Sequence, residues 1–376
     1  MKFDLPKGAG GGIQRGLEYY KGRLYGGDDG GWIRCLDAAT GQEMWSRDFS
    51  KDPEPQGQRP IRFSTACLAF NDKIYTATTG NKNRVICLNA SNGTTAWEFW
   101  ITGENDFGKG GSVWTSPALD EEQRILYVPT GSNKFPGSSD PALFTECILA
   151  FDADSGYLRW FYQSHPNDIH DLDWSAHPVI FDAEGPPMKQ GARRQCVVAG
   201  SKDGFYCIDR YTGELIWRTQ LTQKYFWGGP NVDEIAFAYN KVFVVSNAAT
   251  QLIGKPPISV TAALDGFTGR IVWWTYNLEG VIQGGIAVAN QVMYQGFNDG
   301  RVEALDADTG AVLWQHTLPT ARYGGFAVAN GAMYCSNGVP GAVIEGGGPN
   351  WNPTEMIERH RNAKAYSVYC FTVDGK

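Results

Sequence analysis

The residues best suited to chemistry stand together in one short stretch, SHPNDIHDLDWSAH, which covers residues 164–177. It contains three of the chain's five histidines and three aspartates. Histidine titrates near neutral pH and carboxylates bind hard cations. The stretch could therefore form a metal site, an acid–base site or only a polar loop, and the scaffold that presents it decides between them.

The histidines His165, His170 and His177 offer three ligands, the number that a catalytic zinc ion takes from its protein. Their spacings of five and seven residues fit no known zinc motif, and no cysteine lies close to them in the chain. We therefore do not predict zinc. His170 acting alone as a general base or hydrogen-bond donor is better supported, because neutral imidazole titrates in the useful range.

The aspartates Asp171 and Asp173 alternate along the chain. On a strand they would share a face, and on a loop both could converge on one cation. Two carboxylates are too few for a hard cation unless carbonyls or waters complete six or more oxygen ligands. The competing interpretation is that residues 168–173 form only a solvated connection.

Composition excludes several classes of protein. The net charge of −7 and the lack of a basic run argue against a nucleic-acid partner. No apolar stretch approaches twenty residues, so we predict no membrane span. The N-terminus lacks the apolar core of a signal peptide, which leaves the compartment open. The 46 glycines and 13% aromatic residues favour many turns and short strands.

An internal repeat organises the chain. Its copies are IRCLDAATGQEMW (33–45), VICLNASNGTTAW (85–97), ILAFDADSGYLRW (148–160), FYCIDRYTGELIW (205–217), AALDGFTGRIVW (262–273), VEALDADTGAVLW (302–314) and a decayed VYCFTVDGK (368–376). The tryptophans recur at intervals of 52, 63, 57, 56 and 41 residues. That spacing suits one four-stranded sheet per repeat.

Each part of the motif has a physical reason. The Asp-x-x-Thr-Gly segment predicts a turn, because Asp accepts backbone N–H groups and Gly adopts conformations that side chains disfavour. The tryptophan should then start the outer strand and bury against the neighbouring sheet. Four of the eight cysteines occupy one equivalent position in the repeat (Cys35, Cys87, Cys207 and Cys370). We therefore predict that they are small buried residues and do not form disulfides.

These features predict an all-β fold, with residues 1–376 forming a single β-propeller of four-stranded blades. Seven repeats are visible; seven blades are preferred and eight are possible. If the strand that ends at Val373 joined the sheet of the first repeat, it would close the ring and leave no free sheet edges.

Repeats of this form resemble those of the quinoprotein alcohol dehydrogenases, propellers that bind pyrroloquinoline quinone (PQQ). The resemblance extends to the segments GGSVWTSPALDEEQRILYVPTGS, WFYQSHPNDIHDLDW and GSKDGFYCIDRYTGELIW. The C-terminal third is most similar to the polyvinyl-alcohol-dehydrogenase branch. The resemblance implies an oxidoreductase that acts on a small-molecule or polyol alcohol, in the periplasm or outside the cell, with a separate electron acceptor.

The resemblance also implies roles for individual residues. Trp114, Lys202, Ser132 and Asn133 would bind the cofactor, with the Trp114 indole beneath the quinone. Asp171 would be the catalytic base, and His170 stands where the family has tryptophan. A calcium or lanthanide ion would be bound by three of the side chains (Asp171, Asp173 and Asn133).

The sequence departs from the family at two ligand positions. Ser132 stands directly after Thr-Gly, where the family has its metal-binding asparagine, and Asn133 lies one residue late. Residues 78–83, TTGNKN, hold no carboxylate where the family places its metal-binding glutamate. Two alternatives to a PQQ dehydrogenase therefore stay open. One is a related propeller that uses the pocket for a non-redox or biosynthetic reaction with the His170–Asp171 pair, and the other is a non-catalytic scaffold.

Overall fold

The computed structural model describes residues 16–50, 61–80, 83–101, 110–132, 142–166, 168, 172–186, 191–221, 234–248, 258–277, 282, 284–297, 299–319, 324–336 and 367–372. These residues form strands and turns, and they contain no helix. The chain divides into two compact units, 1–180 with 197–201 and 208–215, and 181–196 with 202–207 and 216–376. The single domain over residues 1–376 stays a prediction.

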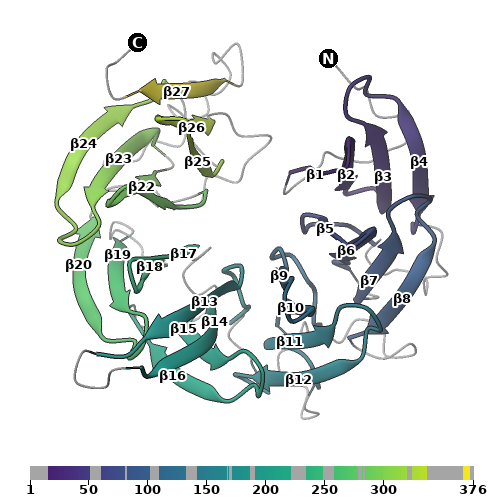
Figure 1. The fold of residues 1–376 in the computed structure, drawn as a ribbon, viewed down its shortest axis with the longest axis horizontal. Helices are drawn as coiled ribbons and strands as arrows, with labels where there is room; N and C mark the ends of the chain where they lie inside the picture. The colour runs from purple at the N-terminus through teal and green to yellow at the C-terminus, as the bar shows by residue number, and fades with distance from the viewer. Residues whose placement is uncertain are drawn as a thin grey trace. The chain divides into compact units, whose positions relative to one another are not determined.

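The first unit contains three four-stranded sheets, in each of which neighbouring strands follow one another in the chain (Figure 1). Their strands are β1 (Glu18–Tyr20), β2 (Arg23–Gly27), β3 (Trp32–Asp37) and β4 (Glu43–Asp48); β5 (Leu68–Phe70), β6 (Lys73–Ala77), β7 (Arg84–Asn89) and β8 (Thr95–Trp100); and β9 (Ala118–Asp120), β10 (Ile125–Pro129), β11 (Cys147–Asp152) and β12 (Leu158–Gln163). All the pairings are antiparallel.

Three of the remaining sheets repeat this plan, and the last has three strands among the described residues. The fourth sheet has residues in both units, and the other three lie in the second unit. Their strands are β13 (Val179–Glu184), β14 (Arg193–Ser201), β15 (Gly204–Asp209) and β16 (Leu215–Thr219); β17 (Glu234–Ala238), β18 (Lys241–Ala248), β19 (Ile258–Asp265) and β20 (Ile271–Asn277); β21 (Ala287–Ala289), β22 (Val292–Gly296), β23 (Arg301–Asp306) and β24 (Val312–Thr317); and β25 (Phe326–Ala329), β26 (Ala332–Ser336) and β27 (Val368–Thr372). The predicted all-β fold with one sheet per repeat is confirmed.

The repeat motif forms the turn that the sequence predicts. Oδ1 of Asp37 accepts hydrogen bonds from the backbone N–H and the hydroxyl of Thr40, both at 2.7 Å. Gly41 follows with a φ of 74°, in the left-handed region that glycine adopts without a steric penalty. In the sixth sheet, Asp306 and Thr309 repeat these contacts.

Five of the six motif tryptophans form a hydrogen bond to the next sheet. The indole N–H of Trp97 donates to the carbonyl oxygen of Ala153 at 3.0 Å, in the turn of the following sheet. A Cβ atom on Gly156 of that turn would meet the Trp97 ring at 2.6 Å, so the glycine lets the ring lie flat against the backbone. The same N–H bond recurs in four other pairs (Trp45 to Ala90, Trp160 to Arg210, Trp217 to Gly266 and Trp273 to Ala307).

Three of the four motif cysteines are buried, as predicted. All eight cysteines are free thiols, and all are buried except Cys370, which is exposed. Cys370 lies in the last and most decayed copy of the motif, where the described residues provide no fourth strand to cover it.

The expected closure of the first sheet by the C-terminal strand is wrong for the described residues. The first sheet consists of β1–β4, and β27 instead pairs with β26, placing Cys370 opposite Tyr334. This register is that of the other repeats, for example Cys35 opposite Tyr25. The decayed copy therefore keeps the pairing of its own hairpin.

Candidate functional site

The acidic loop, which we define as residues 164–178 between β12 and β13, belongs to the first unit. Asp168 and Asp173 are only 6% and 8% exposed, so neither is part of a solvated connection. Oδ2 of Asp168 accepts the backbone N–H of Leu172 at 2.8 Å, which closes the loop on itself. On its far side, the Ser201 hydroxyl donates to the carbonyl oxygen of Leu172 at 2.9 Å.

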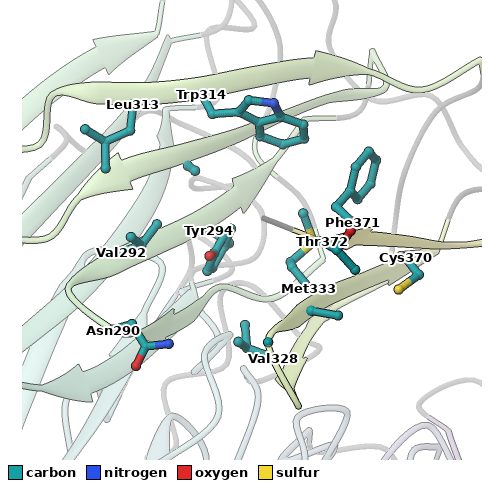
Figure 2. A pocket seen from close by; sticks show the side chains of 13 residues that line it. Asn290, Val292, Tyr294, Leu313, Trp314, Val328, Met333, Cys370, Phe371 and Thr372 are labelled. Atoms are coloured by element: carbon teal, nitrogen blue, oxygen red, sulfur yellow. The ribbon is translucent and has the colours of Figure 1, made fainter. Parts of the chain in front are cut away.

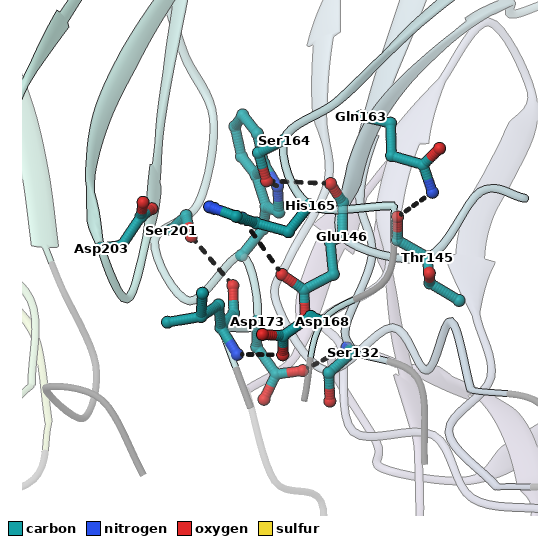
Figure 3. A network of polar contacts seen from close by, with 12 residues as sticks. Ser132, Thr145, Glu146, Gln163, Ser164, His165, Asp168, Asp173, Ser201 and Asp203 are labelled. Atoms are coloured by element: carbon teal, nitrogen blue, oxygen red, sulfur yellow. Dashed lines mark hydrogen bonds and ion pairs between the residues drawn. The ribbon is translucent and has the colours of Figure 1, made fainter. Parts of the chain in front are cut away.

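Asp173 joins this loop to the end of β10. Its Oδ1 accepts the backbone N–H of Ser132 at 2.5 Å, as Figure 3 shows. A Cβ atom on Gly131 would lie 2.6 Å from the same oxygen, so the close approach requires glycine at that position. The Thr-Gly-Ser segment and Asp173 are thus packed directly against each other.

Trp114 lies on a third segment that is bonded to both of these. The Gly131 N–H donates to the carbonyl oxygen of Ser112 at 2.7 Å, and the Thr115 hydroxyl donates to that of Trp174 at 2.9 Å. Trp114 itself is half-buried. Three of the predicted site residues therefore stand on segments that hydrogen bonds hold together (Trp114, Ser132 and Asp173).

A buried carboxyl group that the motifs do not indicate lies beside the acidic loop. Glu146 precedes β11 and is 0% exposed, and its Oε2 lies 3.5 Å from Nδ1 of His165 (Figure 3). Burial raises the pKa of Glu146 to about 8, with further upward contributions from Asp168 and Asp173 and a downward one from His165. The sequence does indicate a buried acid here, because TECILAF places one acidic residue directly before a run of apolar residues.

The other predicted residues are placed differently. Asp171, His170 and Asn133 lie outside the described residues, so their roles stay predictions. Lys202 is 6% exposed and belongs to the second unit, where it precedes Asp203. The Asp203 carboxylate accepts hydrogen bonds from Tyr206 and Arg218 and so fixes the turn that follows Lys202.

The described residues do not form a metal site on their own. Of the three predicted metal ligands only Asp173 is described, and its Oδ1 already accepts a backbone hydrogen bond. No group of three or more His, Cys, Asp or Glu side chains in the described part of the chain could hold a metal ion. At the position of the absent glutamate, Asn83 donates to the carbonyl oxygen of Gly110 at 2.6 Å, and its buried Oδ1 has no hydrogen-bond partner there.

A pocket of about 470 Å³ lies elsewhere, between the sixth and seventh sheets (Figure 2). It is lined by β22, β24, β26 and β27, and apolar side chains such as Val292, Trp314 and Met333 dominate its wall. The lining residues include no carboxylate, histidine or lysine. We do not consider it a candidate active site.

Comparisons with known proteins agree with the fold and with these segments. Residues 100–223 match the family described as "Glucose/ethanol/alcohol dehydrogenase, beta-propeller domain". The quinohemoprotein alcohol dehydrogenase ADH-IIG of Pseudomonas putida is 29% identical over 61% of this chain and 36% of its own length. The polyvinylalcohol dehydrogenase of Sphingopyxis sp. (strain 113P3) is 26% identical over 74% of this chain and 50% of its own length. The chain thus spans half or less of these two relatives.

Solved structures show the same fold. The structure of ADHIIG from Pseudomonas putida HK5 superposes with a TM-score of 0.73 at 21% identity, over 86% of this chain and 62% of that one. A europium-containing methanol dehydrogenase superposes with a TM-score of 0.71 at 19% identity, over 87% of this chain and 73% of that one. Within the described residues, no helix is long and apolar enough to cross a membrane. The family match over residues 100–223 and the relatives make the chain similar to the PQQ-dependent alcohol dehydrogenases, and the solved structures show the same fold.

Proposed function

We propose that the chain forms the propeller of a quinoprotein-type dehydrogenase that oxidises a small-molecule or polyol alcohol with PQQ. One observation carries the proposal. Hydrogen bonds join the segments of Trp114, Ser132 and Asp173, which the sequence resemblance independently selects as the cofactor floor, the cofactor-binding turn and the acidic loop. The relatives that match the chain are named as alcohol dehydrogenases.

Each residue has a role in this proposal. The indole of Trp114 would support the planar cofactor, and Ser132, Asn133 and Lys202 would bind its polar edge. PQQ, when bound, would supply the two-electron acceptor that protein side chains lack. Asp171 would take the proton of the substrate hydroxyl as the carbon gives up its hydride, so that the alcohol becomes a carbonyl compound.

The metal is the less supported part of the proposal. Calcium or a lanthanide would need Asp171, Asp173 and Asn133 together, and the described residues alone do not provide such a set. No catalytic step is therefore assigned to a metal ion. The family resemblance favours electron transfer to a separate acceptor and a periplasmic or secreted location.

Reconstitution tests the proposal directly. The purified protein is titrated with PQQ in the presence of calcium, a lanthanide or neither, while tryptophan fluorescence reports binding and a redox dye reports turnover of simple alcohols. We expect saturable quenching and alcohol-dependent dye reduction. Trp114→Ala should weaken quinone binding about fivefold or more, since ring contacts of this kind contribute ~1 kcal/mol or more. Asp171→Asn should bind the quinone and abolish turnover.

The matched control is Trp274→Ala, because Trp274 is 51% exposed and lies on β20. It should leave binding and turnover unchanged. If PQQ binds neither with calcium, nor with a lanthanide, nor without metal, the proposal is wrong.

A related propeller that performs acid–base chemistry without a quinone is the second candidate. The observation that favours it is the buried Glu146–His165 pair beside two more carboxyl groups, which could transfer protons without a redox cofactor. In this candidate, His170 and Asp171 would act directly on the substrate. An activity that persists without quinone and is lost in both Asp171→Ala and His170→Ala would select it. The absence of any activity, with or without quinone, would favour the non-catalytic scaffold.

A further inference from the structure

Glu146 stands at the junction of the segments that build the candidate site. Its backbone N–H donates to the carbonyl oxygen of Gly131 at 3.0 Å. Its own carbonyl oxygen accepts the backbone N–H and the hydroxyl of Ser164, at 3.0 and 3.1 Å. That Ser164 oxygen in turn accepts the indole N–H of Trp174 at 3.0 Å. One residue thus connects the start of the acidic loop, its far end and the Thr-Gly-Ser segment.

Two features of Glu146 oppose folding. Its φ is 50°, in the left-handed region that costs about 1 kcal/mol or more for a residue with a side chain. Its side chain is fully buried, and apart from the approach of His165 Nδ1 to 3.5 Å neither carboxylate oxygen has a hydrogen-bond partner within the described structure. An ionised carboxylate in such a place is strongly destabilised, so the group retains a proton at neutral pH. A glycine or asparagine would adopt this backbone conformation at a lower cost. We therefore expect the glutamate side chain to have a specific role.

We propose that Glu146 and His165 form a positioning pair that holds the acidic loop against Ser132, so that its docking depends on the proton of Glu146. The pair would act through Asp173 and the backbone and would not touch the substrate. The importance of this pair for catalysis rests on the proposed dehydrogenase function, whereas the effect of the pair on loop docking does not.

The groups that face Glu146 determine the direction of the effect. They are His165, Asp168 and Asp173 on the acidic loop and the thiol of Cys147 on β11. With its proton in place, Glu146 adds no charge to two neighbouring carboxyl groups. When it ionises, a further negative charge appears in a buried site and repels Asp168 and Asp173. The hydrogen bond from Ser132 to Asp173 should then open more often.

Amide hydrogen exchange of the protein without quinone measures this opening. Peptides that contain Ser132 and Leu172 are followed between pH 6 and 9, with the chemical exchange rate corrected for pH. We expect protection in the wild type to fall about tenfold as the pH crosses the pKa of Glu146. Glu146→Gln, which mimics the protonated acid, should show no such step. Glu122→Gln, an exposed control, should behave like the wild type.

A second variant keeps the test decisive if Glu146→Gln folds poorly. His165 lowers the pKa of Glu146, so His165→Leu should move the step to higher pH. A wild-type profile without a step, or the same step in Glu146→Gln, would overturn the inference even if PQQ binds and turnover is observed. If PQQ does not bind but the step appears and follows these variants, the positioning pair stands and the dehydrogenase proposal fails.

Discussion

The backbone N–H of Ser132 donates to Oδ1 of Asp173 across 2.5 Å, linking positions that are 41 residues apart in the chain. This bond fixes the acidic loop relative to the turn that follows β10. Because Gly131 leaves no room for a side chain beside the same oxygen, the contact can be tested without altering either partner.

Gly131→Ala should break this contact. The added methyl group would lie 2.6 Å from Oδ1 of Asp173 and 2.9 Å from the Ser112 hydroxyl, so the loop must move away. Overpacking of this kind costs about 1–3 kcal/mol. We expect a corresponding loss in the free energy of unfolding, measured with denaturant, and weaker quenching of tryptophan fluorescence by PQQ.

The matched control for that substitution is Gly325→Ala. A Cβ atom on Gly325 meets nothing within 4 Å, and its φ is not in the left-handed region. It should leave stability within about 0.5 kcal/mol of the wild type. Equal effects of the two substitutions would show that the Gly131 site is not closely packed in solution.

Lys202→Met should weaken quinone binding while the protein stays folded. Lys202 is buried, and its neighbour Asp203 is fixed by the ion pair to Arg218 at 2.7 Å, so the turn should keep its shape. Removing a buried cation next to an anionic ligand lowers affinity, and we expect at least a tenfold increase in Kd by fluorescence titration, or about 1.4 kcal/mol.

Lys21→Met is the control for Lys202→Met. The Lys21 side chain is 62% exposed, and its pairing with Asp72 is of the surface type that contributes little. An unchanged Kd in Lys202→Met would exclude this lysine from the cofactor site.

The sequence predicted the architecture well because the repeat encodes contacts between adjacent sheets. Each of the first six motifs has a turn, a small buried residue and a tryptophan, and the structure uses all three in successive sheets. The position of the decayed motif in the chain does not reveal which sheet its strand joins. Its pairing register, which matches Cys370 with Tyr334, follows the earlier repeats.

The candidate site could be predicted only in part. Trp114, Ser132 and Asp173 are in segments with a family resemblance, and the structure joins those segments. The role of Glu146 could not be predicted, because its importance arises from burial and from contacts with Gly131 and Ser164, which are distant in the chain. Sequence spacing carries no information on such long-range burial.

The inter-sheet tryptophans should differ in their contribution to stability. Trp97→Phe removes the N–H that donates to Ala153 and leaves a buried acceptor unpaired, at a cost of about 1–3 kcal/mol. Trp314→Phe changes a side chain that is 38% exposed, beside the pocket of the last two sheets, and should cost under about 1 kcal/mol. Denaturant unfolding of both variants checks this, and equal losses would contradict the role of the indole bond.

The stability of the protein should fall with rising pH because of Glu146. Its pKa is about 8 in the folded chain, against an ordinary value of 4.5 for a solvated glutamate, so between these values the folded state binds one more proton than the unfolded state. The free energy of unfolding should then decrease by about 1.4 kcal/mol per pH unit over that window and level off above pH 8.

Glu146→Gln cannot ionise, so its stability should lack this contribution. The difference in unfolding free energy between Glu146→Gln and the wild type should grow from pH 4.5 to about 8 and then stay constant. Denaturant midpoints at several pH values measure it, with the exposed Glu122→Gln as the control. Parallel curves for wild type and Glu146→Gln would mean that the carboxyl group is ionised in the folded protein, and that a cation or a water reaches it.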